Sequence, residues 1–551
     1  MADECPGSDP LRRMIVSVCV AAAGAWLACG GTIARRTRSE PEPTSYAPVA
    51  ASPAASHGMA PSFCRTLAKT GDWASTRVWY GSDGKLRYAS DGENNRIPDF
   101  SYAGYRYGEV DPPNVPVIST LDPAPGDATQ RIQAELDAVG SRPPGTDGFR
   151  GALLLRPGRY EIAGTLYVRH TGVVLRGSGD GADDKTNTIL VATGDTPHQR
   201  TVVVAGSNGS STWKQGDGTP VTDPFVQVGS RSLDVRNAAL FAAGDRVIVR
   251  YPSTQAWIDA IDGGGVVKSA KWTAGKMDLS YLRRVTNIDG TRLFLDAPIF
   301  NHLDNRLATA MVYQASADPV QRVGVEKLRV DIEAAGGDDE NHAWDALGVN
   351  GAEDAWVRAV TAVHFGHAGI FTSGSRLVTI MDSVALEPVG VRTGGRFYNL
   401  DAERGSQLIL FKNCDARGGR HNMITNGAET ASGIVFYRIQ SSSGSASEGH
   451  RHWSQGLLFD NVVDGGTIQL INRGDYGTSH GWGAAHSVIW NDSGTMNVQK
   501  PPTAQNYAIS SKGRLAYRAI FPGAAGFVEV KAGRLIPESL YEAQLCERLG
   551  F

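Results

Sequence analysis

The chain has 551 residues, of which 65 are Gly, 27 are Pro and 41% are apolar, and its formal net charge is −3. A chain that is nearly neutral overall has no general attraction for nucleic acid, so any recognition of a charged ligand must be local. Abundant Gly between short apolar runs favours all-β structure with frequent turns over helical structure.

The first segment, residues 1–29, is predicted to be a secretory signal. Arg12 and Arg13 precede an apolar run that ends at Leu27, and this order is typical of such signals. The run is shorter than the ~20 residues that a membrane-spanning helix needs. Cys29 stands where a bacterial lipoprotein signal is cleaved and lipidated, although Trp26 departs from that motif. The segment therefore fits either a secreted protein or an outer-surface lipoprotein of the cell envelope.

Residues 30–62 are rich in Ala, Pro, Ser and Thr, a composition that predicts a disordered tether. Beyond the signal, only Cys64, Cys414 and Cys546 remain. Because this set is odd in number and sparse, it predicts no disulfide framework.

The segment 63–224 is predicted to contain a helix and the first coils of a solenoid. The helix is expected over 127–139, where Asp127 and Gln130 have the spacing of a capping box. Short strands of three to five residues are predicted next, at 152–155, 160–162, 166–168 and 173–175. Such short, closely spaced strands indicate solenoid rungs, and the helix is expected to cover the open face and edges of the first rung.

Residues 225–300 break this rhythm. Strands become longer and alternate between apolar and polar residues, with a hairpin expected over 283–295. This pattern is typical of an antiparallel sheet with one exposed face. We expect a β-rich insertion that projects as a separate lobe.

The segment 301–551 is predicted to hold the main coils and a C-terminal cap. Asn413, Asn461 and Asn491 each follow a buried run, and their spacing fits coils of roughly 24 to 31 residues. Asn tolerates the left-handed backbone of such turns, and its side chains can bond from rung to rung. A helix within 537–550 is expected to cover the far end.

These features resemble the pectate-lyase-like superfamily of right-handed parallel β-helix proteins. The resemblance rests on the strands and turns of 151–181 and on the coil array 320–500, together about two-thirds of the chain. It implies an all-β fold, a right-handed parallel β-helix with an N-terminal capping helix and an inserted β-rich lobe. The superfamily includes polysaccharide lyases, glycoside hydrolases, epimerases and non-catalytic surface proteins, so the resemblance leaves the chemistry open. No catalytic motif of pectate lyase itself is present.

A candidate site lies in the late coils, where 8 of the 12 His fall between His342 and His486. β-Elimination on a uronic acid polymer needs a cation at the substrate carboxylate and a base for the C5 proton. Arg and His suit these two tasks. The predicted catalytic residues are Arg420, His421, His450, Arg451 and His452, and the predicted substrate-binding residues are Trp453, Trp482, Asp345 and Glu448. Side chains alternate along an extended segment, so at most one of His450 and His452 should share a face with His421.

Two other functions fit the same residues. Glycoside hydrolysis needs two carboxyl groups ~5–9.5 Å apart, and the candidates are Asp338, Asp339, Glu340, Asp345, Glu387, Asp401, Glu403 and Glu448. A non-catalytic glycan-binding or adhesion protein would use the aromatic and Arg side chains without placed acids or bases.

No metal site is assigned from the sequence. His450, His452 and Glu448 lack an identifiable fourth ligand. Asp338–Asn341 fits a solvated turn better than a Ca²⁺ loop. We therefore expect no cofactor, with Ca²⁺ at that turn as the alternative, and no nucleic-acid partner. The prediction is a secreted or surface-attached protein acting on a polysaccharide, as a lyase in the first place, with membrane contact only through a lipid anchor.

Overall fold

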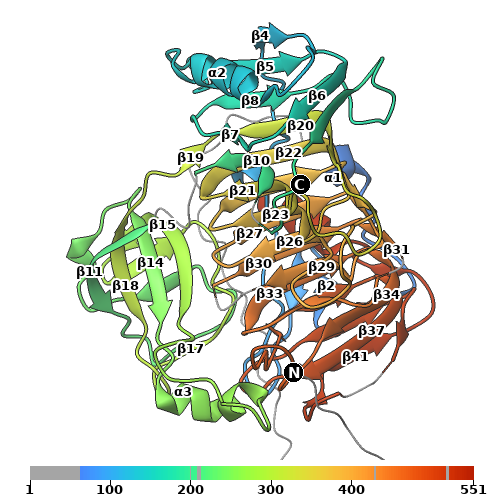
Figure 1. Cartoon of the computed structure of the whole chain (residues 1–551). Coiled ribbons are helices and arrows are strands. Elements are labelled where there is room, and N and C mark those ends of the chain that lie inside the picture. The colour runs from blue at the N-terminus through green and yellow to red at the C-terminus, as the bar shows by residue number, and fades with distance from the viewer. Residues whose placement is uncertain (1–61, 199, 208–212, 427–429, 443, 517–519) are drawn as a thin grey trace, which may run out of the picture. The chain divides into compact units, whose positions relative to one another are not determined.

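Parallel strands, stacked coil on coil, form most of the structure (Figure 1) and pair in three rows, called here sheets A, B and C. The computed structural model describes residues 62–198, 200–207, 213–426, 430–442, 444–516 and 520–551. The predicted signal with Cys29 and nearly all of the predicted tether lie outside these residues. No helix in the described ranges is long and apolar enough to cross a membrane.

Sheets A, B and C take one strand each from most coils. Sheet A contains β4 (Val117–Leu121), β5 (Gly151–Leu155), β8 (Val173–Arg176), the first halves of β20 (Gly324–Ile332) and β22 (Ala352–Val363), β24 (Arg376–Met381), β27 (Gln407–Lys412), β30 (Ser432–Tyr437), β33 (Ser454–Asp460), β36 (Val488–Trp490), β38 (Tyr507–Ser510) and β41 (Phe527–Val530). Sheet B contains β6 (Gly158–Ile162), β9 (Thr188–Ala192), the second halves of β20 and β22, β25 (Val384–Leu386), β28 (Asp415–Arg417), β31 (Gln440–Ser442) and the starts of β34 (Val463–Leu470) and β37 (Ser493–Lys500). Sheet C contains β7 (Leu166–Val168), β10 (Thr201–Gly206), β21 (Asp345–Asn350), β23 (Ala368–Ser373), β26 (Tyr398–Glu403), β29 (His421–Asn426), β32 (Ser447–Gly449), the ends of β34 and β37, and β39 (Arg514–Leu515).

This pairing confirms the predicted parallel β-helix. In sheet A, Arg376 pairs with Gln407, Gln407 with Ser432, and Ser432 with Gln455, register steps of 31, 25 and 23 residues. Identical side chains stack inside the helix. Phe411 lies 4.9 Å from Phe436, whose ring lies 5.1 Å from that of Phe459. Each such fully buried side chain contributes about 1.5–3 kcal/mol.

The asparagine turns also follow the prediction. Asn413, Asn461 and Asn491 have φ values of 54°, 55° and 54°, in the left-handed region that Asn tolerates. Asn491 Nδ2 donates to Asn461 Oδ1 at 3.1 Å, and Asn413 Nδ2 donates to Asp382 Oδ1 at 3.2 Å. These bonds tie the turn of one coil to the turn of the next.

The N-terminal helix α2 runs over Thr129–Gly140 and packs on the first coils (Figure 1). Ile132 and Leu136 are fully buried in the main core. The N-terminus of this helix differs from the predicted capping box, because Ala128 and not Asp127 is the N-cap residue. Asp127 instead accepts bonds from the backbone N–H groups of Thr129 and Ala163, each at 3.0 Å. It therefore joins the helix to the coil that it covers.

The insertion forms a six-stranded antiparallel sheet. In sheet order its strands are β11 (Lys214–Pro220), β18 (Met311–Ser316), β14 (Arg246–Tyr251), β15 (Leu279–Asp289), β16 (Arg292–Leu295) and β13 (Ser232–Asp234). The helix α3 (Gln255–Ala260) and the short pair β12 (Phe225–Val226) and β17 (Leu303–Asp304) belong to the same region. The chain leaves the coils after β10 and returns at β19 (Val320–Gln321).

This lobe packs on the coils. Lobe residues such as Trp257 and Phe300 share one apolar cluster with Leu408 and Trp453 of the coils. Phe300 lies so close that a Cβ built on Gly456 would be 2.1 Å from its Cδ1. The lobe therefore fixes residues of the late coils.

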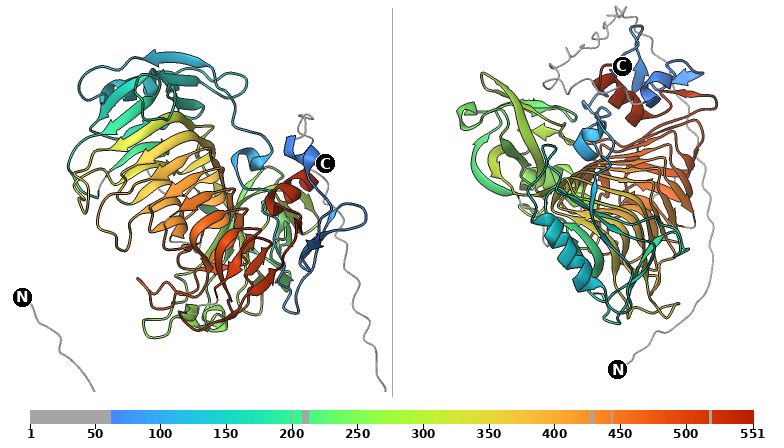
Figure 2. Two further views of the ribbon diagram at one scale, coloured as in Figure 1. Left: turned by 90° about the vertical axis from the view of Figure 1, so that its right-hand side faces the viewer. Right: turned by 90° about the horizontal axis from the view of Figure 1, so that it is seen from above.

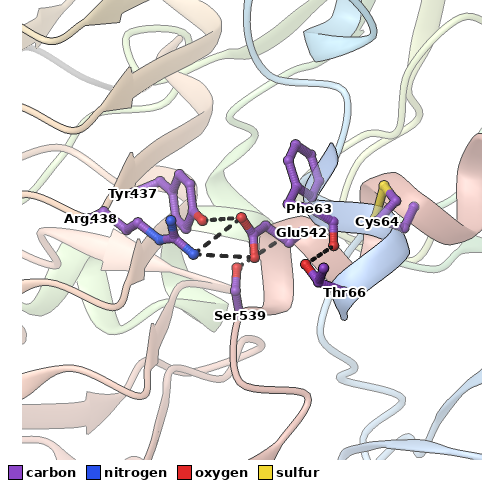
Figure 3. The surroundings of a disulfide bond; sticks show 8 residues. Phe63, Cys64, Thr66, Tyr437, Arg438, Ser539 and Glu542 are labelled. Carbon is purple, nitrogen blue, oxygen red and sulfur yellow. Dashed lines mark hydrogen bonds and ion pairs between the residues drawn. A yellow bond between two sulfur atoms is a disulfide. The ribbon is translucent and has the colours of Figure 1, made fainter. Parts of the chain in front are cut away.

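The two ends of the described chain meet, as Figure 2 shows in blue and dark red. Helix α1 (Ser62–Thr66) is joined to α4 (Leu540–Arg548) by a disulfide between Cys64 and Cys546 (Figure 3). This bond contradicts the prediction that the cysteines form no disulfide. The sequence could not reveal it, because 482 positions separate the two cysteines and their spacing carries no local signal. Cys414 is free and buried.

Helix α4 occupies a different place from the predicted cap at the far end. The Glu542 carboxylate accepts a bond from the Tyr437 hydroxyl and lies 3.3 Å from Arg438 (Figure 3). The Asp460 carboxylate accepts a bond from Tyr541 N at 2.7 Å. Tyr437 and Asp460 are the last residues of β30 and β33, so α4 covers a side of the β-helix and not its far end. Near it lie the small pairs β1 (Trp73–Ala74) with β42 (Leu535–Ile536), and β2 (Val78–Tyr80) with β3 (Leu86–Tyr88).

Candidate functional site

Chemically versatile side chains gather on the outer face of sheet C. Tyr398 pairs with Ala368 on one side and with His421 on the other, and Asp401 and Glu448 are both register partners of Ile424. Parallel stacking therefore brings β23, β26, β29 and β32 together at this place. Two clusters result, one around His421 and one around Asp401.

Glu448 is the centre of the His421 cluster. Its Oε1 lies 3.3 Å from His421 Nδ1, 2.6 Å from His450 Nδ1 and 2.8 Å from Arg473 Nη1. The rings of His421 and His450 are 5.0 Å apart. The structure thus brings His421, Glu448 and His450 together, as the sequence suggested. Glu448 is itself buried, and its carboxylate contacts both imidazoles and Arg473.

His421 is held in one tautomer. Its Nδ1 is 2.7 Å from the carbonyl oxygen of Ala446, so Nδ1 carries the proton and donates. The other nitrogen, Nε2, is buried and has no hydrogen-bond partner among the described residues. Burial lowers the pKa of His421 to about 3, against the opposing charge of Glu448. The ring is therefore neutral near pH 7, with a free lone pair on Nε2.

Tyr398 lies between the two clusters. Arg420 Nη2 donates to the Tyr398 hydroxyl at 3.0 Å. The Tyr398 ring lies 5.7 Å from His421 and 5.2 Å from His367. Burial raises the pKa of Tyr398, and the Arg420 charge opposes this rise. A protonated phenol beside a guanidinium is suited to give up its proton, because the cation stabilises the phenolate.

The Asp401 cluster contains three carboxylates and one imidazole. His367 Nδ1 is 2.8 Å from Asp345 Oδ1, and His367 Nε2 is 3.9 Å from Glu403 Oε1. Burial raises the pKa of Asp401 well above its usual value, and the charge of Glu403 adds to the effect. Burial also opposes protonation of His367, but the carboxylates prevail and raise its pKa to about 9.

Arg451 adjoins both clusters, and His480 adjoins the His421 cluster. Arg451 Nη1 donates to Thr478 Oγ1 at 3.5 Å, while its buried Nε has no partner within the described ranges. The Arg451 charge lowers the pKa of Asp401 and of Glu403 against the effect of burial. The ring of His480 lies 4.7 Å from that of His450. Burial, aided by the charge of Arg473, lowers the pKa of His480 to about 3.

His452, Trp453 and Trp482 do not take their predicted places. His452 lies edge-on to Trp272 of the lobe at 5.7 Å, away from His421, as expected from alternation. Trp453 is 0% exposed, and its Nε1 donates to Asn301 Oδ1 at 3.0 Å. Trp482 is 3% exposed. Neither Trp can stack on a sugar, because the lobe covers both.

The other predicted carboxylates divide into two groups. Asp339 accepts bonds from the backbone N–H groups of Ala335 at 2.8 Å and Asn341 at 3.0 Å, so this segment forms a turn. Glu340 pairs with Arg396. Glu387 is largely exposed. Only Asp345, Asp401, Glu403 and Glu448 reach the site.

Sequence reasoning did not assign Tyr398, His367, Arg473 and His480 to the site. Tyr398 occupies the same coil position as His421, so an alignment of successive coils on their strand starts would have found it. His367, which immediately precedes the strand start of β23, follows from the same alignment. Arg473 and His480 lie outside strands, in the chain between β34 and β35 (Ala484–Ala485), where the repeat gives no register.

Comparisons with known proteins give only distant matches. No family model matches the chain, and no curated protein matches it. Similar solved structures include the tailspike protein gp49 from Pseudomonas phage LKA1, at 15% identity and TM-score 0.37, covering 73% of this chain and 69% of that one. The A-module of mannuronan C-5 epimerase AlgE4 from Azotobacter vinelandii is 12% identical, with a TM-score of 0.30, over 75% of this chain and 98% of that one. PfbA, a surface adhesin of Streptococcus pneumoniae, is 11% identical, with a TM-score of 0.36, over 75% of this chain and 82% of that one. The fold assignment rests on the strand pairing, and the function on the site.

Proposed function

We propose that this protein cleaves an acidic, uronic-acid-containing polysaccharide by β-elimination. The observation that carries the proposal is the imidazole of His421. Its proton is fixed on Nδ1 by Ala446, and its free Nε2 lone pair is buried beside arginine side chains. A neutral base among cations is what proton abstraction next to a substrate carboxylate requires.

The reaction balances with residues of this site. Arg451 binds the C6 carboxylate and makes the C5 proton acidic. His421 Nε2 takes that proton, the electron pair forms the C4–C5 double bond, and the C4–O bond breaks. Tyr398 gives its phenolic proton to the leaving oxygen, and Arg420 stabilises the phenolate. Because the substrate is itself an anion, its arrival raises the low pKa of His421 towards a useful value.

Glu448 completes this arrangement. Its carboxylate faces Nδ1 of His421, so it stabilises the imidazolium that forms on proton transfer. Its further partners, His450 and Arg473, hold the carboxylate in place. We assign Glu448 a positioning role and His421 the role of base.

The test is a screen of the purified chain on acidic and neutral polysaccharides, with two readouts. Absorbance of the unsaturated product together with new reducing ends supports the lyase. His421→Gln should then lower turnover by about 10²- to 10⁴-fold, while the matched surface variant His170→Gln keeps it. A full-rate His421→Gln enzyme would contradict the assignment of the base.

Glycoside hydrolysis is the second candidate, favoured by Asp401 and Glu403. Carboxylate oxygens of the two residues lie within 4.8 Å of each other, near the ~5–5.5 Å separation used by retaining glycosidases. Reducing ends without product absorbance would support this alternative. Retention on a glycan column without cleavage would support a binding or adhesion protein.

We further propose that the chain acts outside the cytoplasm. The disulfide between Cys64 and Cys546 supports export, because such bonds persist in oxidising compartments. Labelling with a radioactive fatty acid distinguishes the two forms. A lipoprotein incorporates the label and Cys29→Ser abolishes it, whereas a secreted protein stays unlabelled in the medium.

A further inference from the structure

Three side chains of the Asp401 cluster converge on one point of sheet C. His367, Asp401 and Glu403 each offer a ligand atom, and these atoms all lie within 4.8 Å of one another. Asp401 and Glu403 share strand β26, and His367 directly precedes the neighbouring strand β23. Two rigid, paired strands therefore fix the ligands relative to each other.

Asp401 is the member of the cluster whose surroundings indicate a missing ligand. Its side chain is 0% exposed, and neither carboxylate oxygen has a hydrogen-bond partner in the part of the chain that the structure describes. A buried carboxylate without donors costs several kcal/mol, and buried polar groups are normally satisfied. Asp345 in the same cluster accepts bonds from His367, Ala368 and Thr201, so Asp401 differs from its neighbour.

His367 is oriented for metal binding. Its Nδ1 donates to Asp345 Oδ1 at 2.8 Å, which leaves Nε2 facing Glu403 and Asp401. Asp345 is held in turn by Ala368 N and Thr201 Oγ1, each at 3.0 Å. A carboxylate that binds one nitrogen of a histidine while the other nitrogen binds an ion is the usual arrangement in metalloproteins, because it fixes the tautomer and the ring.

The charges of the cluster also favour a divalent cation. Asp345, Asp401 and Glu403 carry three negative charges when ionised, and the nearby Arg451 supplies one positive charge. A divalent ion supplies the other two. An imidazole nitrogen with two carboxylate oxygens suits Zn²⁺ or a similar transition ion, whereas Ca²⁺ takes six to eight oxygen ligands.

We propose that His367, Asp401 and Glu403 bind a divalent transition-metal ion of the Zn²⁺ class, with Asp345 as the carboxylate that orients the histidine. Three protein ligands leave a coordination position open for water or a substrate oxygen. The proposal goes beyond the β-elimination chemistry and does not depend on it. It also separates this cluster from the second candidate function, because a bound ion occupies the carboxylates that a hydrolase would use.

The His421 cluster is a less suitable metal site, although His421, Glu448 and His450 also lie close together. Arg473 Nη1 is 2.8 Å from Glu448 Oε1 and donates to the carbonyl oxygen of His450 at 2.9 Å. Its positive charge already occupies the place of a cation. His421 Nδ1 is committed to the Ala446 carbonyl.

The experiment is a zinc titration of the full chain. The protein is stripped with a chelator and dialysed. ZnCl₂ binding is then followed by calorimetry, and bound metal is counted by mass spectrometry. We expect one Zn²⁺ per chain, and Co²⁺ in its place should give a d–d absorption spectrum. Asp401→Asn and Glu403→Gln should each weaken binding by at least about 100-fold, and Asp345→Asn by about 10- to 100-fold.

The control is Glu448→Gln, which should bind Zn²⁺ with unchanged affinity. If Asp401→Asn fails to fold by circular dichroism, Glu403→Gln carries the test, because the Glu403 side chain is 26% exposed. Absence of stoichiometric binding, binding that survives both carboxamide variants, or binding lost only in Glu448→Gln would each overturn the proposal. His421→Gln should keep the zinc while losing lyase activity, so failure of one proposal is distinguishable from failure of the other.

Discussion

At the scale of single residues, the site depends on which polar groups are already paired. Glu448, Asp345 and Arg420 already have several partners each. His421 Nε2, Arg451 Nε and both Asp401 oxygens have none in the described ranges. Since buried polar groups are normally satisfied, the unpaired ones identify the positions at which a substrate or an ion is expected.

Arg451→Lys tests whether the guanidinium, and not only its charge, is required. Lys keeps the positive charge but loses the planar fork that grips a carboxylate through two bonds. Turnover on the best acidic substrate should fall by roughly 100-fold or more, by analogy with loss of one preorganised donor. Arg306→Lys is the matched control, because Arg306 is exposed and, among the described residues, its side chain bonds only Asp304. Equal rates for the two variants would remove Arg451 from the mechanism.

His421 should also make the protein sensitive to acid. Its pKa is about 3 in the folded chain and ~6.5 when unfolded, so between these values the unfolded chain binds a proton that the folded chain does not. Stability is therefore fully present above pH 6.5 and is lost as the pH falls. The free energy of unfolding, measured in urea at pH 4 to 7, should fall less steeply with falling pH for His421→Gln than for the wild type, by up to about 1.4 kcal/mol per pH unit. If the two proteins lose stability equally as the pH falls, the imidazole is solvated in the folded chain.

At the scale of elements, prediction from sequence succeeded where a repeat imposed the structure. The coil strands and the turns at Asn413, Asn461 and Asn491 follow from local pattern, because each rung repeats the burial of the one before it. Trp453 and Trp482 were misjudged because their burial depends on the lobe, whose contacts join residues about 150 to 200 positions apart along the chain. No local pattern encodes such contacts.

The lobe–coil contact can be tested at Gly456. Gly456 and Gly290 both have φ of +59°, but a Cβ at Gly456 meets Phe300 at 2.1 Å whereas one at Gly290 meets nothing within 4 Å. Both Ala variants carry the same backbone strain of about 1–2 kcal/mol, and only Gly456→Ala adds overpacking of about 1–3 kcal/mol. Melting temperatures should rank wild type, Gly290→Ala and then Gly456→Ala. If the two variants melt together, the lobe is not in tight contact with this coil.

At the scale of the whole molecule, long-range links bind the coils, the lobe and the two chain ends into one structure. Arg283 of the lobe donates to Gln407 of sheet A at 2.9 Å, and the Ser75 hydroxyl near the N-terminal end bonds Glu529 near the C-terminal end at 2.5 Å. The site lies on coils that the lobe holds from outside. The sequence could predict the coils and the residue types of the site, but not this mutual support, which arises only in the folded chain.

The disulfide between Cys64 and Cys546 is the strongest of these links. It closes a loop of 482 positions, and because a cross-link removes conformations from the unfolded chain, its loss should cost about 2–5 kcal/mol. The Cys64→Ser, Cys546→Ser double variant should therefore melt at a lower temperature than the wild type. Dithiothreitol should lower the wild-type melting temperature to that of the variant and leave the variant unchanged, since its remaining described cysteine, Cys414, is free. A reductant effect of the same size on both proteins would show that dithiothreitol acts elsewhere and would contradict a stabilising role for the bond between Cys64 and Cys546.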